Sequence, residues 1–291
     1  MRHKLVCYAF LLLGIILAIS LLSCAGKSGP EMEWCKLFGE GTNVYGSSVQ
    51  QTSDGGYVVY ARKDSYEKPS GGGAWLIKAD ADGNIVWEKI INGAEMTFGN
   101  SGQQTTDGGY IMCGTILKDK EIGVYCIWLI RTDPEGNKLW ERTFRSSKRG
   151  AWGRSVKQTT DGGYILCGQS DDHTRLIKTD ADGNTIWDKT LASQNSADSG
   201  SSVQQTADGG YIVCGVTWPS IVNGPDAYKP NVWLVKTDAD GNKLWDRTFG
   251  GEMYASASKV QQTTDGGYIT CGQGLSGGSP RLLLSKIAPE E

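Results

Sequence analysis

Aromatic, charged and imidazole side chains that could hold a ligand stand in the variable segments of this sequence. Tryptophan and tyrosine beside polar groups suit stacking on a sugar ring or anchoring a protein partner. The candidate ligand-binding residues are Trp152, Arg154, Asp171, His173, Trp218, Tyr228 and Tyr254. For Trp218 and Tyr228, packing between loops explains the ring equally well, because loop aromatics often pack locally.

Groups that could catalyse a reaction are few. His173 is the one histidine beyond the first three residues, and without a second histidine it is a poor metal ligand and a weak general base. A glycosidase needs two carboxylates around its substrate. The segments before the repeated Asp-Gly-Gly words instead carry Arg154, Lys157 and Lys259 as their charges. Because no Gly-x-Ser-x-Gly nucleophile motif occurs either, we expect a non-enzymatic protein without a cofactor.

Acidic turns invite a calcium interpretation. Asp80 and Asp82 have the first spacing of an EF-hand loop, and two later turns repeat it. The remaining ligands of such a loop are missing, above all the glutamate at its twelfth position. Aspartate and glycine favour turns for backbone reasons alone, so we expect plain turns and no bound metal.

The sequence repeats one unit five times. The word Asp-Gly-Gly-Tyr begins at Asp54, Asp107, Asp161, Asp208 and Asp265, at intervals of 53, 54, 47 and 57 residues. Each unit predicts four short strands, a to d, as in residues 48–52, 211–214, 233–236 and 243–249. The Asp-Gly-Gly and Asp-Gly-Asn words between them are typical of tight turns, because glycine accepts a positive φ.

Strands b and c are apolar on both faces, which fits strands covered on both sides. A repeat of four such strands is the blade of a β-propeller. The sequence therefore predicts an all-β, five-bladed β-propeller of four-stranded blades. The last unit stops after strand c, whereas residues 34–39 resemble strand d. We expect this N-terminal strand to complete the last blade, because closure removes exposed edges.

Residues present in every unit are expected to be structural. One glutamine per unit should bond strand backbones near the axis, although a ring of amides binding an ion or a small polar ligand is the alternative. One tryptophan of each strand d should wedge between blades. These residues are Gln51, Gln104, Gln158, Gln205 and Gln262, and Trp34, Trp87, Trp140, Trp187 and Trp245.

In such blades the two short turns share one rim, and the b–c and d–a loops share the other. The second set of loops varies between units, and binding residues gather on variable loops of a rigid scaffold. The candidate ligand-binding residues belong to these loops.

The N-terminal sequence is typical of an export signal. An apolar run over residues 5–22 follows Arg2 and Lys4 and ends at Ser23-Cys24, which is typical of a secretory signal. This ending resembles the lipobox of bacterial lipoproteins, in which Cys24 would be lipidated. A plain signal or an uncleaved anchor helix is the alternative. We therefore expect a signal peptide at 1–23, a tether at 24–31 and the propeller at 32–291.

Charge and cysteine content restrict the partners. The chain has 29 basic and 32 acidic residues in interspersed positions, which argues against a nucleic-acid partner. Four of its cysteines, Cys113, Cys167, Cys214 and Cys271, follow the repeat tyrosine by three residues. Equivalent positions in neighbouring units lie too far apart for disulfides, so we expect buried free thiols.

The complete unit, Gln-x-Thr-x-Asp-Gly-Gly-Tyr to Asp-Gly-Asn-x-x-Trp, resembles repeat propellers of exported bacterial and archaeal proteins, mostly lipoproteins of unknown function. Its last six residues, as in 182–187, also look like the tryptophan-docking motif of pyrroloquinoline-quinone-type propellers. That group implies eight blades and adjacent cysteines, which this chain lacks, so we expect no quinone cofactor.

Taken together, the sequence predicts a lipid-anchored protein outside the cytoplasm, facing the periplasm or the exterior, that serves as a binding or scaffold module. Its partner would be a protein or a glycan on the variable-loop face. The alternative is a lectin-like propeller that binds glycans. A glycoside hydrolase is a third hypothesis, and the basic charges of strand a argue against it.

Overall fold

The computed structural model describes residues 32–40, 43–64, 73–91, 97–119, 121–146, 150–193, 197–218, 229–250, 254–276 and 279–290. The chain divides into two compact units, Met1–Lys36 and Leu37–Glu291. The architecture below is that of the second unit. The predicted signal peptide, the tether and Cys24 lie outside the described residues, in which no helix is long and apolar enough to span a membrane.

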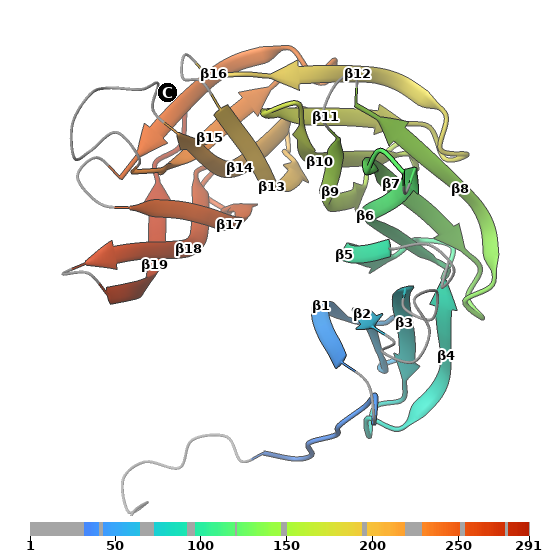
Figure 1. Ribbon diagram of the computed structural model, residues 1–291. Helices are drawn as coiled ribbons and strands as arrows, with labels where there is room; N and C mark the ends of the chain where they lie inside the picture. The colour runs from blue at the N-terminus through green and yellow to red at the C-terminus, as the bar shows by residue number, and fades with distance from the viewer. Residues whose placement is uncertain are drawn as a thin grey trace, which may run out of the picture. The chain divides into compact units, whose positions relative to one another are not determined.

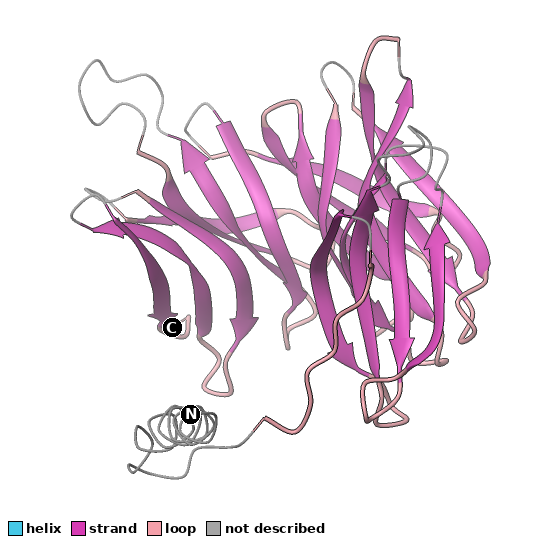
Figure 2. Cartoon of the chain, turned by 60° about the horizontal axis from the view of Figure 1, so that its bottom comes forward, coloured by secondary structure: helices cyan, strands magenta, loops and turns pink. Residues whose placement is uncertain are grey.

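All regular elements of the described residues are β-strands (Figure 2). In chain order they are β1 (Asn43–Gln51), β2 (Tyr57–Asp64), β3 (Gly73–Ala79), β4 (Ile85–Ile91), β5 (Thr97–Gln104), β6 (Tyr110–Asp119), β7 (Val124–Thr132), β8 (Lys138–Arg145), β9 (Ala151–Gln158), β10 (Tyr164–Ser170), β11 (His173–Thr179), β12 (Thr185–Leu191), β13 (Ala197–Gln205), β14 (Tyr211–Trp218), β15 (Asn231–Thr237), β16 (Lys243–Phe249), β17 (Ala255–Gln262), β18 (Tyr268–Ser276) and β19 (Ser279–Ile287).

The strands form five antiparallel sheets, and each sheet is one sequence unit. Four sheets have four strands, in the orders β1-β2-β3-β4, β5-β6-β7-β8, β9-β10-β11-β12 and β13-β14-β15-β16. From β1 to β17, the first strand of each sheet contacts the first strand of the sheet that follows it, so β1, β5, β9, β13 and β17 line the inner side of the propeller, which is open between the fifth and the first sheet (Figure 1). The predicted five-bladed β-propeller is confirmed.

The predicted closing strand is not formed. The fifth sheet has three strands, β17-β18-β19, and residues 32–39 contain no strand. Within the second unit, Phe38 packs against the cluster of Ala61, Trp75 and Ile77 in blade 1, just as Ile91 of blade 1 joins the core cluster shared with blade 2. The apolar contact that strand d makes with the next blade is thus present, whereas its ladder with β19 is absent.

Apolar clusters between successive blades form the core. The tryptophan of strand d meets the strand b tyrosine of the next blade edge to face, as in Trp87 with Tyr110, whose ring centroids lie 5.6 Å apart. Trp140–Tyr164, Trp187–Tyr211 and Trp245–Tyr268 repeat this contact. Since edge-to-face pairs stabilise beyond their buried area, the predicted wedges are confirmed for these four tryptophans.

In the second, third and fourth blades, the glycine of the second turn lies against the tryptophan of the preceding blade. Gly183 has a φ of +77°, and a Cβ there would lie 2.7 Å from the ring of Trp140. Two reasons favour glycine at this position. The positive φ would strain any residue that has a side chain, and a Cβ would collide with the neighbouring ring.

The strand b cysteines are packing residues. Cys113, Cys167 and Cys214 are free and fully buried. Burial raises the pKa of the Cys113 thiol to about 12, so this group stays protonated and unreactive at neutral pH.

A cation braces each Asp-Gly-Gly turn, and it is buried in the first four blades and exposed in the fifth. Lys178, at the end of strand c, is 4% exposed and lies 2.8 Å from the Asp161 carboxylate. Its ammonium also donates to the Thr179 carbonyl, and Asp161 accepts from Thr159 and from the Gly163 amide. The same pair recurs in the other blades, as Lys78–Asp54, Arg131–Asp107, Lys236–Asp208 and Lys286–Asp265.

Asp161→Asn should test this brace, because it leaves the Lys178 cation buried without its counter-charge. We expect the free energy of unfolding to fall by about 1–2 kcal/mol, less than for a fully buried pair because solvent screens the exposed carboxylate. Asp161→Asn combined with Lys178→Met should recover part of the loss. Denaturant unfolding measures both, with Asp182→Asn on the exposed second turn as a control expected to stay within about 0.5 kcal/mol. Additive effects of the two substitutions would contradict the pairing.

Candidate functional site

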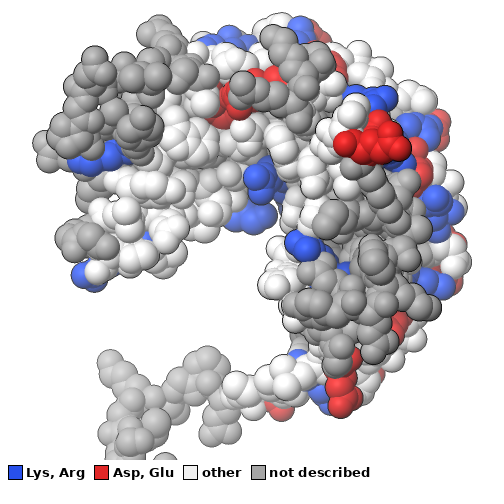
Figure 3. Space-filling view, in the orientation of Figure 1, with Lys and Arg blue, Asp and Glu red and all other residues white. Residues whose placement is uncertain are grey.

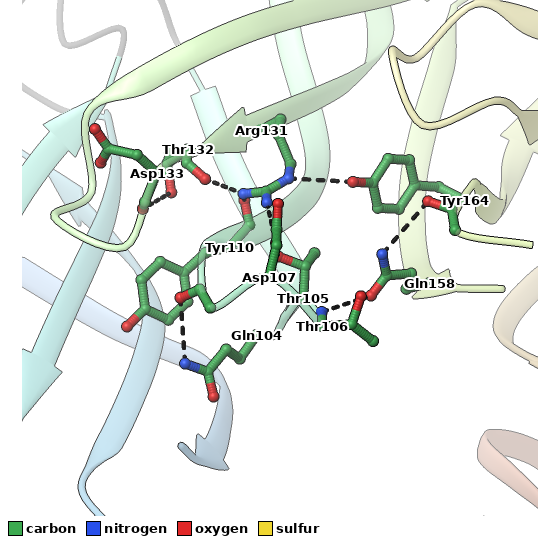
Figure 4. Close-up of polar contacts among 12 residues, drawn as sticks. Gln104, Thr105, Thr106, Asp107, Tyr110, Arg131, Thr132, Asp133, Gln158 and Tyr164 are labelled. Atoms are coloured by element: carbon green, nitrogen blue, oxygen red, sulfur yellow. Dashed lines mark hydrogen bonds and ion pairs between the residues drawn. The ribbon is translucent and has the colours of Figure 1, made fainter. Parts of the chain in front are cut away.

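Repeated glutamines link neighbouring blades. The Gln158 carbonyl oxygen accepts from the Thr106 amide of the preceding blade at 2.9 Å, and its amide nitrogen donates to Gly162 of its own turn (Figure 4). Gln104, Gln205 and Gln262 make the same two bonds. The predicted bonding to backbones is confirmed, and the amides are occupied by the scaffold rather than turned toward a ligand.

The Asp-x-Asp-Gly-Asn turns satisfy their own carboxylates. Asp180 accepts from the Asn184 amide nitrogen and side chain at 2.8 and 2.9 Å, and Asp238 does the same with Asn242. The bond from the Asn184 side chain is the main cause that lowers the pKa of Asp180. Among the described residues, no group of three or more His, Cys, Asp or Glu side chains could hold a metal ion. Turn geometry accounts for these residues.

The polar side chains of the short-turn rim are therefore engaged in internal bonds. The open space lies along the axis and reaches the turn residues Thr160 and Ala207. Three cavities are lined there by first strands of several blades, with volumes of about 600, 490 and 400 Å³. Figure 3 shows some Lys and Arg on the inner border of the open arc and others on its outer side, while the visible Asp and Glu lie away from the inner border.

The cavity of about 400 Å³ lies at the variable-loop end, where the first strands begin. Two predicted site residues, Arg154 of β9 and Trp218 of β14, line it together. The other lining residues are Asn100, Gln169, Ser199, Ser201, Val216 and Ser258. A guanidinium, an aromatic ring and several hydroxyl and amide groups thus face one space, which suits a polar ligand with an apolar face.

The remaining predicted residues do not join this cavity. Trp152 of β9 stacks on Tyr125 of β7 with ring centroids 6.2 Å apart, so its ring packs between these two strands. Asp171 has a φ of +52° in the two-residue hairpin turn before β11 and accepts from Ser146. Tyr254 is 39% exposed and its carbonyl accepts from Leu275. Tyr228 lies outside the described residues.

His173 has an acidic neighbour that the sequence did not reveal. Its Nδ1 lies 3.9 Å from Asp198 Oδ2, beyond hydrogen-bond reach. Asp198 is fully buried and accepts from the Ser193 amide and hydroxyl at 2.8 and 2.7 Å. The carboxylate therefore anchors the connection into β13, a role that a lone aspartate in a variable loop gives no signal for.

The first strands also show which polar residues sequence reasoning missed. Asn100, Arg154, Ser201 and Ser258 occupy the same place in four successive units, four residues before the second glutamine of strand a. Only Arg154 had been singled out. The shared position in the repeat could have identified the other three residues. Side chains at one position of successive first strands face the same axial space.

Lys157 lines the axial space and is repelled by a second lysine, Lys259. It lines both larger cavities, and Lys259 lines one of them with it. Burial by the surrounding blades, followed by repulsion from Lys259, lowers the pKa of Lys157. A lysine with a lowered pKa costs stability while it is charged, because the folded state binds its proton less tightly than the unfolded state does.

No protein-family model matches this sequence, and comparison with curated proteins finds no match. Among solved structures, the chain is similar to a protein of unknown function from Bacteroides caccae, with a TM-score of 0.54 and 12% identity over 87% of this chain and 81% of that one. A xylan β-1,4-xylosidase from Bacillus halodurans aligns with a TM-score of 0.45 and 12% identity over 82% of this chain and 52% of that one. A levansucrase from Bacillus subtilis aligns at 0.45 with 7% identity over 84% of each chain.

At these identities the likeness concerns the fold alone. The first of these structures supports the propeller architecture across most of both chains. The class that fold and geometry define is thus a five-bladed β-propeller whose axis carries basic side chains.

Lys157→Gln should stabilise the protein at neutral pH. Glutamine stands at this place in the other four units, so the substitution fits the scaffold and removes a charge repelled by Lys259. We expect the free energy of unfolding to rise by a few tenths to about 1 kcal/mol, since solvent screens part of the repulsion.

The gain should be full below the lowered folded pKa of Lys157. It should vanish as the pH rises past the unfolded value of about 10.4. Urea unfolding at pH 7 and near pH 10.5 measures the difference. A gain of equal size at both pH values would show that repulsion is not its source.

Proposed function

We propose that this protein is an exported, lipid-anchored binding module that holds its partner at the variable-loop end of the propeller axis. Cys24 would carry the lipid anchor, and the partner would be a glycan or a protein outside the cytoplasm. The observation that carries the proposal is the cavity in which Arg154 and Trp218 face one space among small polar residues.

The opposite rim supports this choice of face. Its aspartates, glutamines and lysines are bonded to one another or to the backbone in successive blades, so a ligand there would compete with structural bonds. At the variable end, Arg154 has no hydrogen-bond or ion-pair partner within the described residues. An unpaired guanidinium beside an aromatic ring is the kind of anchor that dominates binding surfaces.

The lining chemistry favours binding over hydrolysis. The residues around the three axial cavities include Lys157, Lys259 and Arg154 but no aspartate or glutamate. Glycoside hydrolysis needs a carboxylic acid and a second carboxylate on either side of the scissile bond.

A lectin-like glycan partner is the alternative that one observation favours. Trp218 shares its cavity with Ser199, Ser201, Ser258 and Asn100. A ring beside hydroxyl and amide groups can stack on a sugar face while bonding its hydroxyls. A protein partner would use the same tryptophan as an apolar anchor.

Trp218→Ala and Arg154→Ala should each weaken partner binding by about tenfold or more, since anchors of this kind contribute over about 1.4 kcal/mol. Screening residues 26–291 on a glycan array, and recovering cross-linked partners from the native membrane, would identify the partner. Binding strength is then compared between the parent protein and the two variants.

Tyr254→Ala is the matched control, because this exposed ring does not line the cavity. Affinities within twofold of the parent for both cavity variants would place the site elsewhere. Turnover of a polysaccharide that disappears on changing one acidic residue near the axis would overturn the non-enzymatic reading.

A further inference from the structure

The five repeats serve as internal controls for one another, and two axial positions break their pattern. One position carries Gln50, Gln103, Gln204 and Gln261 in four units and Lys157 in the third. The other carries Ser48, Ser101, Ser155 and Ser202 in four units and Lys259 in the fifth. Because the neutral residues suffice for the scaffold four times, packing alone does not explain the two lysines.

The two departures meet in space. Lys157 of β9 and Lys259 of β17 line the same cavity of about 490 Å³, together with Ser48, Ser202 and Gln261. The remaining lining residues are Val49, Val260, Ile269, Thr270, Cys271 and Leu284. Lys157 also lines the cavity of about 600 Å³, which shares Val260 and Gln261 with the first cavity.

These lysines lack the counter-charge that the protein gives its other inward lysines. Lys78, Lys178 and Lys236 each lie within 3.0 Å of an aspartate. In the part of the chain that the structure describes, Lys157 and Lys259 have no hydrogen-bond or ion-pair partner.

A third polar group in the cavity is also without a partner. Thr270, one of the residues that line this cavity, is 1% exposed, and its buried hydroxyl makes no hydrogen bond. Leaving a buried hydroxyl unbonded costs free energy comparable to a lost hydrogen bond. Two unpaired cations and an unbonded hydroxyl facing one cavity make a site that lacks its acceptor.

We infer that this axial cavity binds a small dianion, such as phosphate, sulfate or a short dicarboxylate, between the ammonium groups of Lys157 and Lys259. Thr270, Ser48 and Ser202 are the hydroxyl donors available to its remaining oxygens. The site is separate from the cavity that holds Arg154 and Trp218, so it does not depend on the partner proposed there.

The mutual repulsion of the lysines adds a pH dependence. A bound dianion attracts both ammonium groups and offsets the repulsion that lowers the pKa of Lys157. Binding should weaken as the pH rises through that pKa. The groups facing Lys157 across the cavity are Lys259 and neutral side chains, so no acidic group masks this effect.

The test is titration of the full chain, purified in detergent, with sulfate, phosphate and malonate at constant ionic strength set by chloride. Calorimetry gives the affinity, and thermal unfolding gives the stabilisation. The decisive variant is Lys157→Gln with Lys259→Ser, which restores the residues that the other units carry and should therefore fold. We expect it to lose affinity for each dianion by about tenfold or more, since each lost charge removes an attraction of about 1 kcal/mol or more.

Lys138→Gln with Lys243→Gln is the matched control, because it removes two surface charges that make i,i+3 ion pairs outside the cavity. Its affinity should equal that of the parent. Thr270→Val keeps both charges and should weaken binding by several-fold through the lost donor. Equal responses of the parent and of the Lys157→Gln, Lys259→Ser variant to dianions would overturn the inference, as would stabilisation by chloride alone.

Discussion

Each blade of this propeller depends on one cation at the end of its third strand, which is buried in the first four blades and exposed in the fifth. The ammonium of Lys178, and its counterparts in the other units, ties the Asp-Gly-Gly turn between strands a and b to the end of strand c. Desolvating a lysine is costly unless an acid and further acceptors surround it. The aspartate, the carbonyl and the threonine that supply those bonds therefore have to recur with it, which explains why the Asp-Gly-Gly word is so uniform.

This constraint divides the molecule into a structural rim and a free rim. Once the aspartates and the second glutamines are committed to turns and to neighbouring blades, the short-turn rim has little capacity left for a ligand. Variation is tolerated where no such bonds are required, at the b–c and d–a connections and at a few axial positions. The Arg154 cavity and the lysine cavity both occur there.

Regular features could be predicted from the sequence because five copies of one unit report the same environment five times. The strands, the turns, the bridging glutamines and the tryptophan wedges all follow from that repetition. The Lys178–Asp161 type of pair was present in the same repeats but joins residues on different strands, so no local pattern joined them. Asp198 and Thr270 were unpredictable for another reason: Asp198 lies near His173 of the preceding blade, and the cavity that Thr270 lines is formed by several blades that only the fold brings together.

The closing strand shows the limit of pattern matching. Residues 34–39 match strand d by type, and Phe38 does make the apolar contact with blade 1, yet a strand also needs hydrogen bonds to a partner edge, which side-chain pattern cannot supply. The fifth sheet therefore ends at β19, where Leu282 is 84% and Leu284 is 67% exposed.

The lysine cavity adjoins this least covered blade. Lys259 comes from β17, and Leu284 of β19 lines the same space as Lys157. Repulsion between two like charges thus involves the one described sheet that has three strands, where an exposed edge favours local opening. Serine and glutamine would relieve that cost without a change of backbone, since four other units use them. A charge pair that opposes folding at its weakest point is explained by an anion that the pair attracts, and not by the scaffold.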